Sequence, residues 1–211
     1  MGSYVKKAQA KVSSEITLPV GYSLVWSGQY EYMQAAAKQL NMIVPLTILV
    51  IFMLLYFLFK NFTQSLIVML SLPFSLVGGV WLFYIFGFNT SVAVWVGFIA
   101  LAGLAAETGV VMLVYLNEAV ARYKREAKLN SEDDLIAAIK EGAVERVRPK
   151  LMTVGTTMLA LLPALLGTGT GSEVMQRIAA PMVGGLISST FLTLIIIPLL
   201  YLLLMRKQID L

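Results

Sequence analysis

The sequence predicts an all-α membrane protein with five transmembrane helices and a short extracytoplasmic N-terminal segment. Hydrophobic residues make up 58% of the 211 residues, and the mean hydropathy is +0.80. Only 13% of the residues are charged, and they gather in a few blocks between long apolar runs. Apolar runs of about 20 residues are long enough to cross a bilayer as helices. These observations together favour a membrane domain over a water-soluble fold.

The composition also excludes several kinds of site. The chain has no Cys and no His, so it cannot form disulfides or the usual zinc sites. The sequence shows no nucleophile and base pair and no phosphate loop, so we expect no enzyme, no cofactor and no nucleic-acid partner. Its 11 methionines are the remaining soft ligands, and thioethers suit Cu(I).

The N-terminal segment, residues 1–28, is polar and begins with a lysine cluster at Lys6, Lys7 and Lys11. Apolar and polar residues alternate between residues 16 and 28, and Pro19 and Gly21 interrupt the pattern. We predict a short helix or coil followed by a strand.

The five predicted membrane helices follow from the lengths of the apolar runs. The first belongs to residues 29–60, where an amphipathic stretch leads into an apolar run. The second contains Pro73 and the Gly78-Gly79 pair, which can kink a membrane helix. We predict the second helix at residues 65–87, the third at 92–118, the fourth at 150–167 and the fifth at 178–205.

Residues 119–149 form the most polar part of the chain, and we predict a loop that carries a surface helix. Ser131 precedes three acidic residues, which is typical of a helix N-terminus. The helix should run to about Arg146 and lie along the membrane. Its apolar side is predicted to contain Leu135, Ile136, Ile139 and Val144.

The basic residues predict the orientation of the helices, because cytoplasmic loops carry an excess of Lys and Arg. With the N-terminus outside and the C-terminus inside, eleven basic residues lie on the cytoplasmic side: Lys60, Arg122, Lys124, Arg125, Lys128, Lys140, Arg146, Arg148, Lys150, Arg206 and Lys207. The other side keeps five: Lys6, Lys7, Lys11, Lys38 and Arg177. An external N-terminus without a signal peptide leads us to expect a fragment of a longer protein.

Glu107 is the residue that most suggests a function, because it lies near the middle of the third apolar run. A charge at the centre of a membrane helix costs about 2.5–3.5 kcal/mol even on the translocon scale. We expect its helix face, which holds Ala100 and Gly103, to look into a helix bundle, since small residues allow close packing. Glu107 then serves either as a proton-binding group or as an interior hydrogen-bonding residue that fixes packing.

Lys150 is open to two interpretations. Beside Arg146, Arg148 and Pro149 it resembles an interfacial anchor whose ammonium reaches toward water. Glu107 lies eleven residues before Glu118, or about 16 Å along the helix, so a lysine at the interface could not reach it. A link between them requires Lys150 to lie well inside the bundle, or hydroxyls that bridge the gap.

Four strings of residues carry a resemblance to a known family: LPVGYSLVWSGQYEYM, LAGLAAETGVVMLVYLNE, ERVRPKLMT and GTGTGSEVMQRIAAPMVGG. The sequence resembles the C-terminal membrane segment of the resistance-nodulation-division (RND) transporters, and within them the copper and silver exporters of the heavy-metal efflux branch. The five predicted helices then match the eighth to twelfth of the family's twelve. Residues 1–28 match the end of its second periplasmic domain.

The resemblance implies a location and a set of partners. Family members are homotrimers of the bacterial inner membrane, which gives this chain a periplasmic N-terminus and a cytoplasmic C-terminus. The implied partners are the lipid bilayer, the N-terminal half of the transporter, a periplasmic adaptor and an outer-membrane channel.

The resemblance also implies roles for four residues. Glu107 matches the acidic member of the family's proton relay, Lys150 its basic partner and Thr153 a relay hydroxyl. Met175 matches a methionine proposed to pass Cu(I) or Ag(I) along the metal path. Drug-exporting relatives typically carry a Lys where this chain has Glu107, which favours the metal branch.

We therefore predict a fragment of a proton-driven exporter of Cu(I) or Ag(I), with the metal as its transported substrate. An RND exporter of organic compounds and a membrane scaffold segment that transports nothing are the alternatives.

Overall fold

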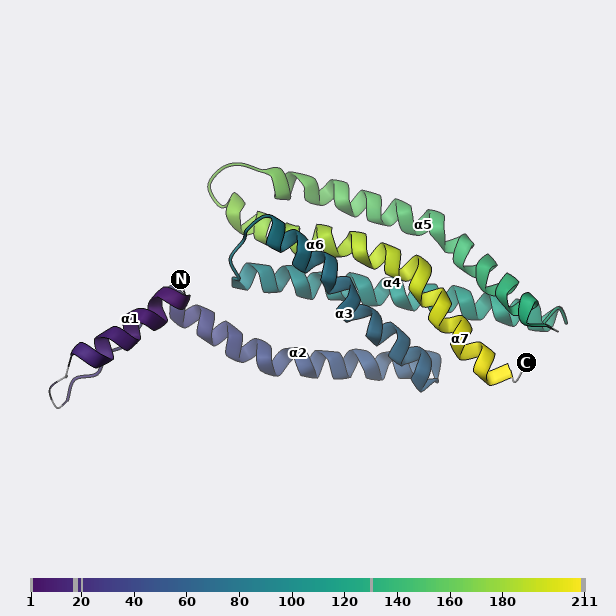
Figure 1. Cartoon of the computed structure of the whole chain (residues 1–211), viewed down its shortest axis with the longest axis horizontal. Coiled ribbons are helices and arrows are strands. Elements are labelled where there is room, and N and C mark those ends of the chain that lie inside the picture. The colour runs from purple at the N-terminus through teal and green to yellow at the C-terminus, as the bar shows by residue number, and fades with distance from the viewer. Residues whose placement is uncertain (1, 17–18, 20, 130, 210–211) are drawn as a thin grey trace. The chain divides into compact units, whose positions relative to one another are not determined.

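The computed structural model describes residues 2–16, 19, 21–129 and 131–209, and all regular structure in these ranges is helical. Helices α1 and α2 span Gly2–Glu15 and Gln29–Phe59, and α3 and α4 span Phe62–Ile85 and Val92–Arg125 (Figure 1). Helix α5 spans Glu132–Leu166. The last helix is continuous and consists of α6 (Ser172–Phe191), a π-helical turn at Leu192–Ile196 and α7 (Ile197–Ile209). The all-α class is confirmed.

Five helices among the described residues are long and apolar enough to cross a membrane. The spans are Tyr30–Phe59, Phe62–Ile85, Val92–Arg125, Glu132–Leu166 and Ser172–Arg206. The third and fourth are longer than predicted, since the helices continue into the polar segment between them. The prediction of five transmembrane helices is confirmed by length and composition.

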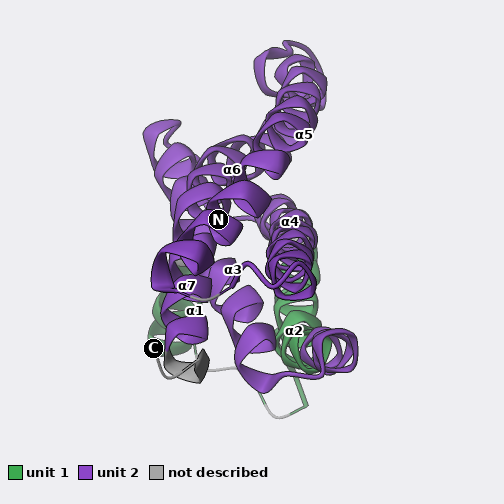
Figure 2. Cartoon of the chain, turned by 90° about the vertical axis from the view of Figure 1, so that its right-hand side faces the viewer, with its two compact units in different colours: residues 1–49 green, residues 50–211 purple. Residues whose placement is uncertain are grey.

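Residues 1–49 form one compact unit, which Figure 2 colours green, and residues 50–211 form the other. The smaller unit contains α1 and the first part of α2. The strand predicted between residues 16 and 28 is wrong for the described part of that range, which contains no strand. An isolated strand leaves its backbone groups without partners. Thr17, Leu18 and Val20 of the predicted strand lie outside the described residues.

The larger unit has an apolar core where the start of α3 and the second half of α4 meet α5 and α7. Its fully buried side chains include Val68, Met112, Leu116, Leu135 and Tyr201. They come from α3, α4, α5 and α7, so the core joins one end of each of these four helices. A second, smaller cluster of buried residues contains Leu165, Ala179 and Ala180.

Helices α3 and α6 cross at glycines, which allows their backbones to touch. A Cβ atom added at Gly184 would lie 2.7 Å from the Cβ of Leu82, and the carbonyl oxygen of Gly78 stands even closer. The Ser188 hydroxyl donates to the Ser75 carbonyl at 2.9 Å across the same crossing. In lipid the hydrophobic effect does not drive helices together, because the acyl chains are as apolar as the helix surfaces. Close packing of small residues and hydrogen bonds between helices stabilise the contact instead.

The polar segment 119–149 differs from its prediction as a loop with a separate surface helix. It divides between the end of α4 and the beginning of α5, and only residues 126–131 connect the two helices. Ser131 caps α5 as predicted and forms a capping box with Asp134. Of the predicted apolar side, Leu135 and Ile139 are buried but Ile136 and Val144 are exposed, because α4 covers a narrower stripe than the sequence pattern suggests.

The connection between α4 and α5 holds an exposed ion pair. Lys128 Nζ lies 2.6 Å from Glu126 Oε2. The hydrogen bond and charge of Lys128 lower the pKa of the Glu126 carboxyl, and Glu126 raises the pKa of Lys128 in return. The pair contributes at neutral pH and is lost as the pH falls through the lowered pKa of Glu126. Exposed pairs of this kind contribute little to stability.

Candidate functional site

Glu107 lies on a face of α4 that no other part of the described chain covers. Its side chain is exposed, as are Ala100, Gly103 and Val114 on the same face. A Cβ atom added at Gly103 would meet no heavy atom within 4 Å. The predicted small-residue face therefore exists, but these five helices do not pack against it. They pack against the other side of α4, where Leu101 and Ala105 are buried.

Lys150 is buried at the contact between α4 and α5, with 4% of its surface exposed. Its Nζ donates to Thr108 Oγ1 at 2.9 Å. The Thr108 hydroxyl in turn donates to the Leu104 carbonyl at 2.6 Å. Since Thr108 directly follows Glu107, the ammonium group lies at the level of the carboxylate. No ion pair within 4.0 Å joins Glu107 to Lys150 or to another described cation.

The lengths of α4 and α5 explain why Lys150 lies far from the ends of its helix. Helices α4 and α5 have 34 and 35 residues, or about 51 and 52 Å at 1.5 Å per residue. The hydrocarbon core of a bilayer is only about 30 Å thick. The apolar run that starts after Lys150 thus begins in the middle of α5, and Lys150 does not lie at a helix end. The interfacial-anchor interpretation is inconsistent with its burial.

Thr153 lies one turn after Lys150 on an exposed part of α5. Its hydroxyl donates to the backbone carbonyls of Pro149, at 2.7 Å, and Lys150, at 3.2 Å. Such bonds to the preceding turn are common for membrane threonines and can bend a helix. The structure does not bring the Thr153 hydroxyl into hydrogen-bond contact with the side chain of Glu107 or Lys150.

Arg146 is a second cation at this contact that the sequence analysis treated only as a topology signal. Its guanidinium lies 5.3 Å from the centre of the Tyr115 ring on α4, in the geometry of a cation–π interaction. The Arg146 Nε is buried and has no hydrogen-bond partner in the described part of the chain. Arg146 and Lys150 are four residues apart, so both lie on the helix face that packs against α4.

Ion pairs join the second half of α4 to the first half of α5. Arg122 lies 2.8 Å from Glu141 and 3.2 Å from Glu145, and the Tyr123 hydroxyl donates to Glu141 at 2.8 Å. Networks of this kind are worth more than isolated surface pairs. They join α4 and α5 on one side of the contact between Lys150 and Thr108, and the close packing of Gly142 against Ala119 and Tyr115 joins the same two helices.

A polar cluster of Gln64, Asn117 and Tyr201 joins α3, α4 and α7. The side chains of Gln64 and Asn117 exchange two hydrogen bonds of 3.0 and 2.9 Å, and the Tyr201 hydroxyl donates to Asn117 Oδ1 at 2.7 Å. Gln64 and Tyr201 are 5% and 1% exposed. The sequence analysis missed this cluster, although an Asn and a Gln inside apolar runs are a signal that could have indicated it.

Met175 lies on the first turns of α6, where 57% of its surface is exposed. The preceding Gly-rich stretch forms a turn, with φ of 135° at Gly169 and 86° at Gly171. Gln176 donates to the Gly167 carbonyl at 2.8 Å and closes this turn. Within the described residues, no group of three His, Cys, Asp or Glu side chains could hold a metal ion.

Comparison with known proteins identifies the family. Residues 1–205 match the AcrB/AcrD/AcrF family. The chain is 48% identical over 203 residues to the cation efflux system protein CusA of Escherichia coli (strain K12), and 39% identical over 210 residues to the cobalt-zinc-cadmium resistance protein CzcA of Cupriavidus metallidurans. These alignments cover 95% and 100% of this chain and 19% of each relative.

Two crystal structures of a heavy metal efflux pump have the same fold as this chain. Crystal form II matches with a TM-score of 0.78 at 34% identity and covers 96% of this chain. Crystal form I matches with a TM-score of 0.74 at 32% identity and covers 98%. The chain spans 19% of each solved structure, about one fifth of the length of the relatives it matches. The chain belongs to the AcrB/AcrD/AcrF family of RND transporters, and is a multi-pass membrane protein and not an enzyme.

Proposed function

We propose that this chain is part of a proton-driven inner-membrane exporter of Cu(I) or Ag(I), in which Glu107 exchanges the proton and Lys150 is its basic partner. The observation that carries the proposal is the buried Lys150 ammonium, which donates to Thr108 next to Glu107. A lysine and a carboxylate placed together in a membrane helix pair are typical of proton relays in pumps and transporters.

Protonation of Glu107 changes the charge that faces Lys150. The unprotonated carboxylate attracts the ammonium group, while the protonated acid does not, so each state favours a different arrangement of α4 and α5. We assign Thr153 a supporting role in this step. Its hydroxyl bonds the backbone carbonyls of Pro149 and Lys150, and such bonds to the preceding turn can bend a helix at the level of Lys150.

The uncovered face of α4 supports a partner inside the same transporter. A carboxylate that faced acyl chains would be costly, so another part of the membrane domain should cover Glu107, Gly103 and Ala100. We propose that the N-terminal half of the transporter supplies this part. A homotrimer, a periplasmic adaptor, an outer-membrane channel and the surrounding bilayer complete the proposed assembly. In this assembly the N-terminal segment of the chain is periplasmic and its C-terminus is cytoplasmic.

Three features support a metal substrate over an organic one. The acidic residue Glu107 stands where drug exporters typically carry a Lys. The relatives are described as cation efflux and metal resistance proteins. Met175 supplies an exposed thioether on the proposed periplasmic side, and thioethers suit Cu(I) and similar soft ions.

Metal tolerance of cells that carry the complete transporter tests this proposal. Glu107→Gln keeps the shape of the side chain but cannot carry a proton, so we expect loss of copper and silver tolerance at matched membrane expression. Glu118→Gln on the same helix is the control, because Glu118 is also exposed and has no assigned role. Full tolerance with Glu107→Gln would contradict the proposal.

A further inference from the structure

The exposed side of α5 changes its chemical character along the helix. Between residues 151 and 166 the helix contains no charged residue, and its large exposed side chains are apolar. The preceding part of α5 is different, because basic and apolar side chains alternate there at every fourth position. These exposed residues form the outer stripe of α5: Ile136, Lys140, Val144 and Arg148. Residues four apart lie on one face of a helix, so the stripe is a single surface.

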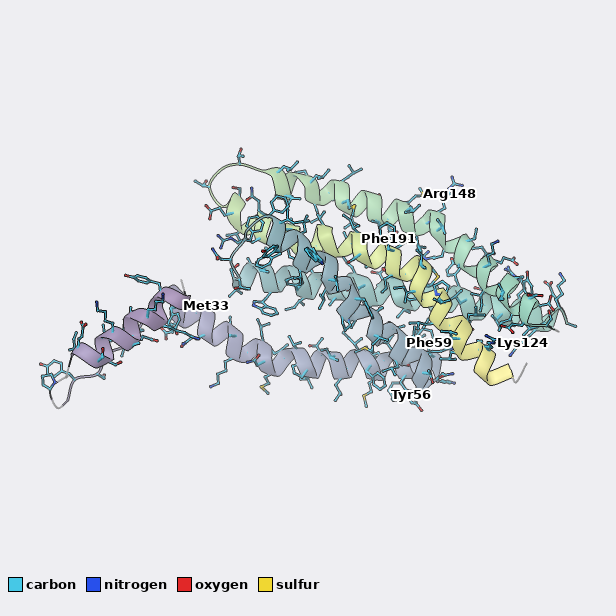
Figure 3. The ribbon with its side chains drawn as sticks, viewed as in Figure 1. Met33, Tyr56, Phe59, Lys124, Arg148 and Phe191 are labelled. Atoms are coloured by element: carbon cyan, nitrogen blue, oxygen red, sulfur yellow. The ribbon has the colours of Figure 1, made fainter. Side chains whose placement is uncertain are left out.

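The outer stripe lies on the opposite side of α5 from its contact with α4. A Cβ atom added at Gly142 would lie 2.9 Å from the Cβ of Ala119 on α4, and Lys150 is buried at the same contact. Lys140 and Arg148 each come two residues before one of these buried positions, and two residues turn a helix by about 200°. Arg148 accordingly points away from the neighbouring helices (Figure 3).

The two cations of the outer stripe have no acidic partner in the described part of the chain. The acidic side chains of α5 that form ion pairs use other cations, since Glu141 and Glu145 pair with Arg122 and Glu132 pairs with Arg206. Neither Lys140 nor Arg148 takes part in an ion pair within 4.0 Å among the described residues. The counter-ions of this stripe therefore come from its surroundings.

The depth of the outer stripe follows from the length of the uncharged part of α5. Residues 151–166 are about 24 Å long, and the hydrocarbon core of a bilayer is about 30 Å thick. The core therefore ends about one turn before residue 151, close to Arg148. Lys140 lies about 12 Å further along the helix, and the headgroup region is about 5–8 Å thick. Helix tilt shortens this distance along the membrane normal, and long basic side chains reach toward the phosphates.

We propose that the outer stripe binds the headgroups of anionic phospholipids, with phosphate groups on Lys140 and Arg148 and Val144 against the apolar part of the lipid below them. A guanidinium binds a phosphate through two parallel hydrogen bonds, and an ammonium binds it as a point charge. A negatively charged membrane surface attracts each basic side chain. The bound headgroups hold the first half of α5 at the membrane surface. This inference does not depend on the roles proposed for Glu107 and Lys150.

The test identifies the lipid beside Val144 in the complete transporter. Val144 is 60% exposed, so a fluorescent label on Val144→Cys leaves the core intact, and this chain has no cysteine of its own. The labelled protein is reconstituted in phosphatidylcholine bilayers that contain brominated phosphatidylglycerol or, at the same fraction, brominated phosphatidylcholine. Bromine atoms quench a fluorophore that they touch. We expect phosphatidylglycerol to be enriched at the label by about fivefold for each of the two cations, and less so at high salt.

Charge variants assign the enrichment to the outer stripe. Lys140→Gln together with Arg148→Gln should make the two brominated lipids quench equally, whereas Lys140→Arg should keep the enrichment. Lys124→Gln is the control for net charge, because Lys124 is exposed on α4 and lies outside the stripe. If the labelled Val144→Cys protein does not assemble, Ile136→Cys places the label on the same stripe at a residue that is 41% exposed.

Equal quenching by the two brominated lipids in the unmodified stripe would overturn the inference, and so would an enrichment that survives the double glutamine variant. Quenching by neither lipid would show that protein covers the stripe, from a second copy or from another part of the transporter, and would overturn it as well. An equal loss of enrichment in Lys124→Gln would show that net charge attracts the lipid, and that Lys140 and Arg148 form no site.

Discussion

Lys150 on α5 donates a hydrogen bond of 2.9 Å to Thr108 on α4, 42 residues away in the sequence. This contact places a buried cation beside the intramembrane Glu107. Buried charges persist in proteins when they are paired or when function requires them. The contact depends on the register of α4 and α5, which also meet at the ion pairs of Arg122 with Glu141 and Glu145.

Lys150→Leu should abolish transport without lowering the stability of the complete transporter. The shorter, apolar leucine removes the desolvation cost of the ammonium, so the melting temperature should stay the same or rise. Thermal unfolding of the purified protein and a metal tolerance assay measure the two effects. Lys124→Leu is the control, because Lys124 is also a cation but is exposed in the last turn of α4 (Figure 3). Normal transport by Lys150→Leu would refute the relay.

Asn117→Leu should destabilise the membrane domain by about 1–2 kcal/mol, because it leaves Gln64 buried without its partner. The midpoint of unfolding of the purified transporter measures this loss. A second change, Gln64→Leu, should recover part of the stability, since it removes the orphaned amide. Additive losses in the double variant would show that the two side chains do not act as a pair.

Gly184→Ala should weaken the crossing of α3 and α6, since its Cβ would lie 2.7 Å from the Cβ of Leu82. Overpacking of this kind costs about 1–3 kcal/mol. Gly155→Ala is the matched control, because a Cβ there meets nothing within 4 Å and alanine favours a helix. Equal unfolding midpoints for the two variants would contradict the close crossing.

Gly103→Leu tests whether another part of the transporter covers Glu107. The substitution meets no neighbour among the described residues, so it should leave the helicity of the isolated 211-residue chain unchanged. In the complete transporter it should lower the yield of assembled protein or its transport activity. Wild-type assembly and transport would mean that the Glu107 face stays uncovered.

The helices could be predicted because their signals are local. Apolar length predicts a span, and Ser131 with its acidic neighbours predicts the start of α5. The continuity of α5 through Pro149 could not be predicted. The end of an apolar run indicates where the chain leaves the apolar part of the bilayer, and the helix itself can continue beyond that point. The described part of residues 16–28, where we predicted a strand, contains none, because alternation alone does not supply a neighbouring strand.

The candidate site could be predicted only in part. Glu107 stands out in any sequence, since an acidic residue in an apolar run is rare. The depth of Lys150, the ring contact of Arg146 and the Gln64 cluster depend on the register between helices that are distant in sequence. That register depends on side-chain packing and on ion pairs between helices, which a hydropathy pattern does not contain.

The most direct test of the account is metal uptake into proteoliposomes that contain the complete transporter under an imposed pH gradient. We expect the gradient to drive Ag(I) accumulation by the wild type and to have no effect on Glu107→Gln, although the variant still exchanges Ag(I) across the membrane. Accumulation by Glu107→Gln at the wild-type rate would show that the proton does not pass through Glu107.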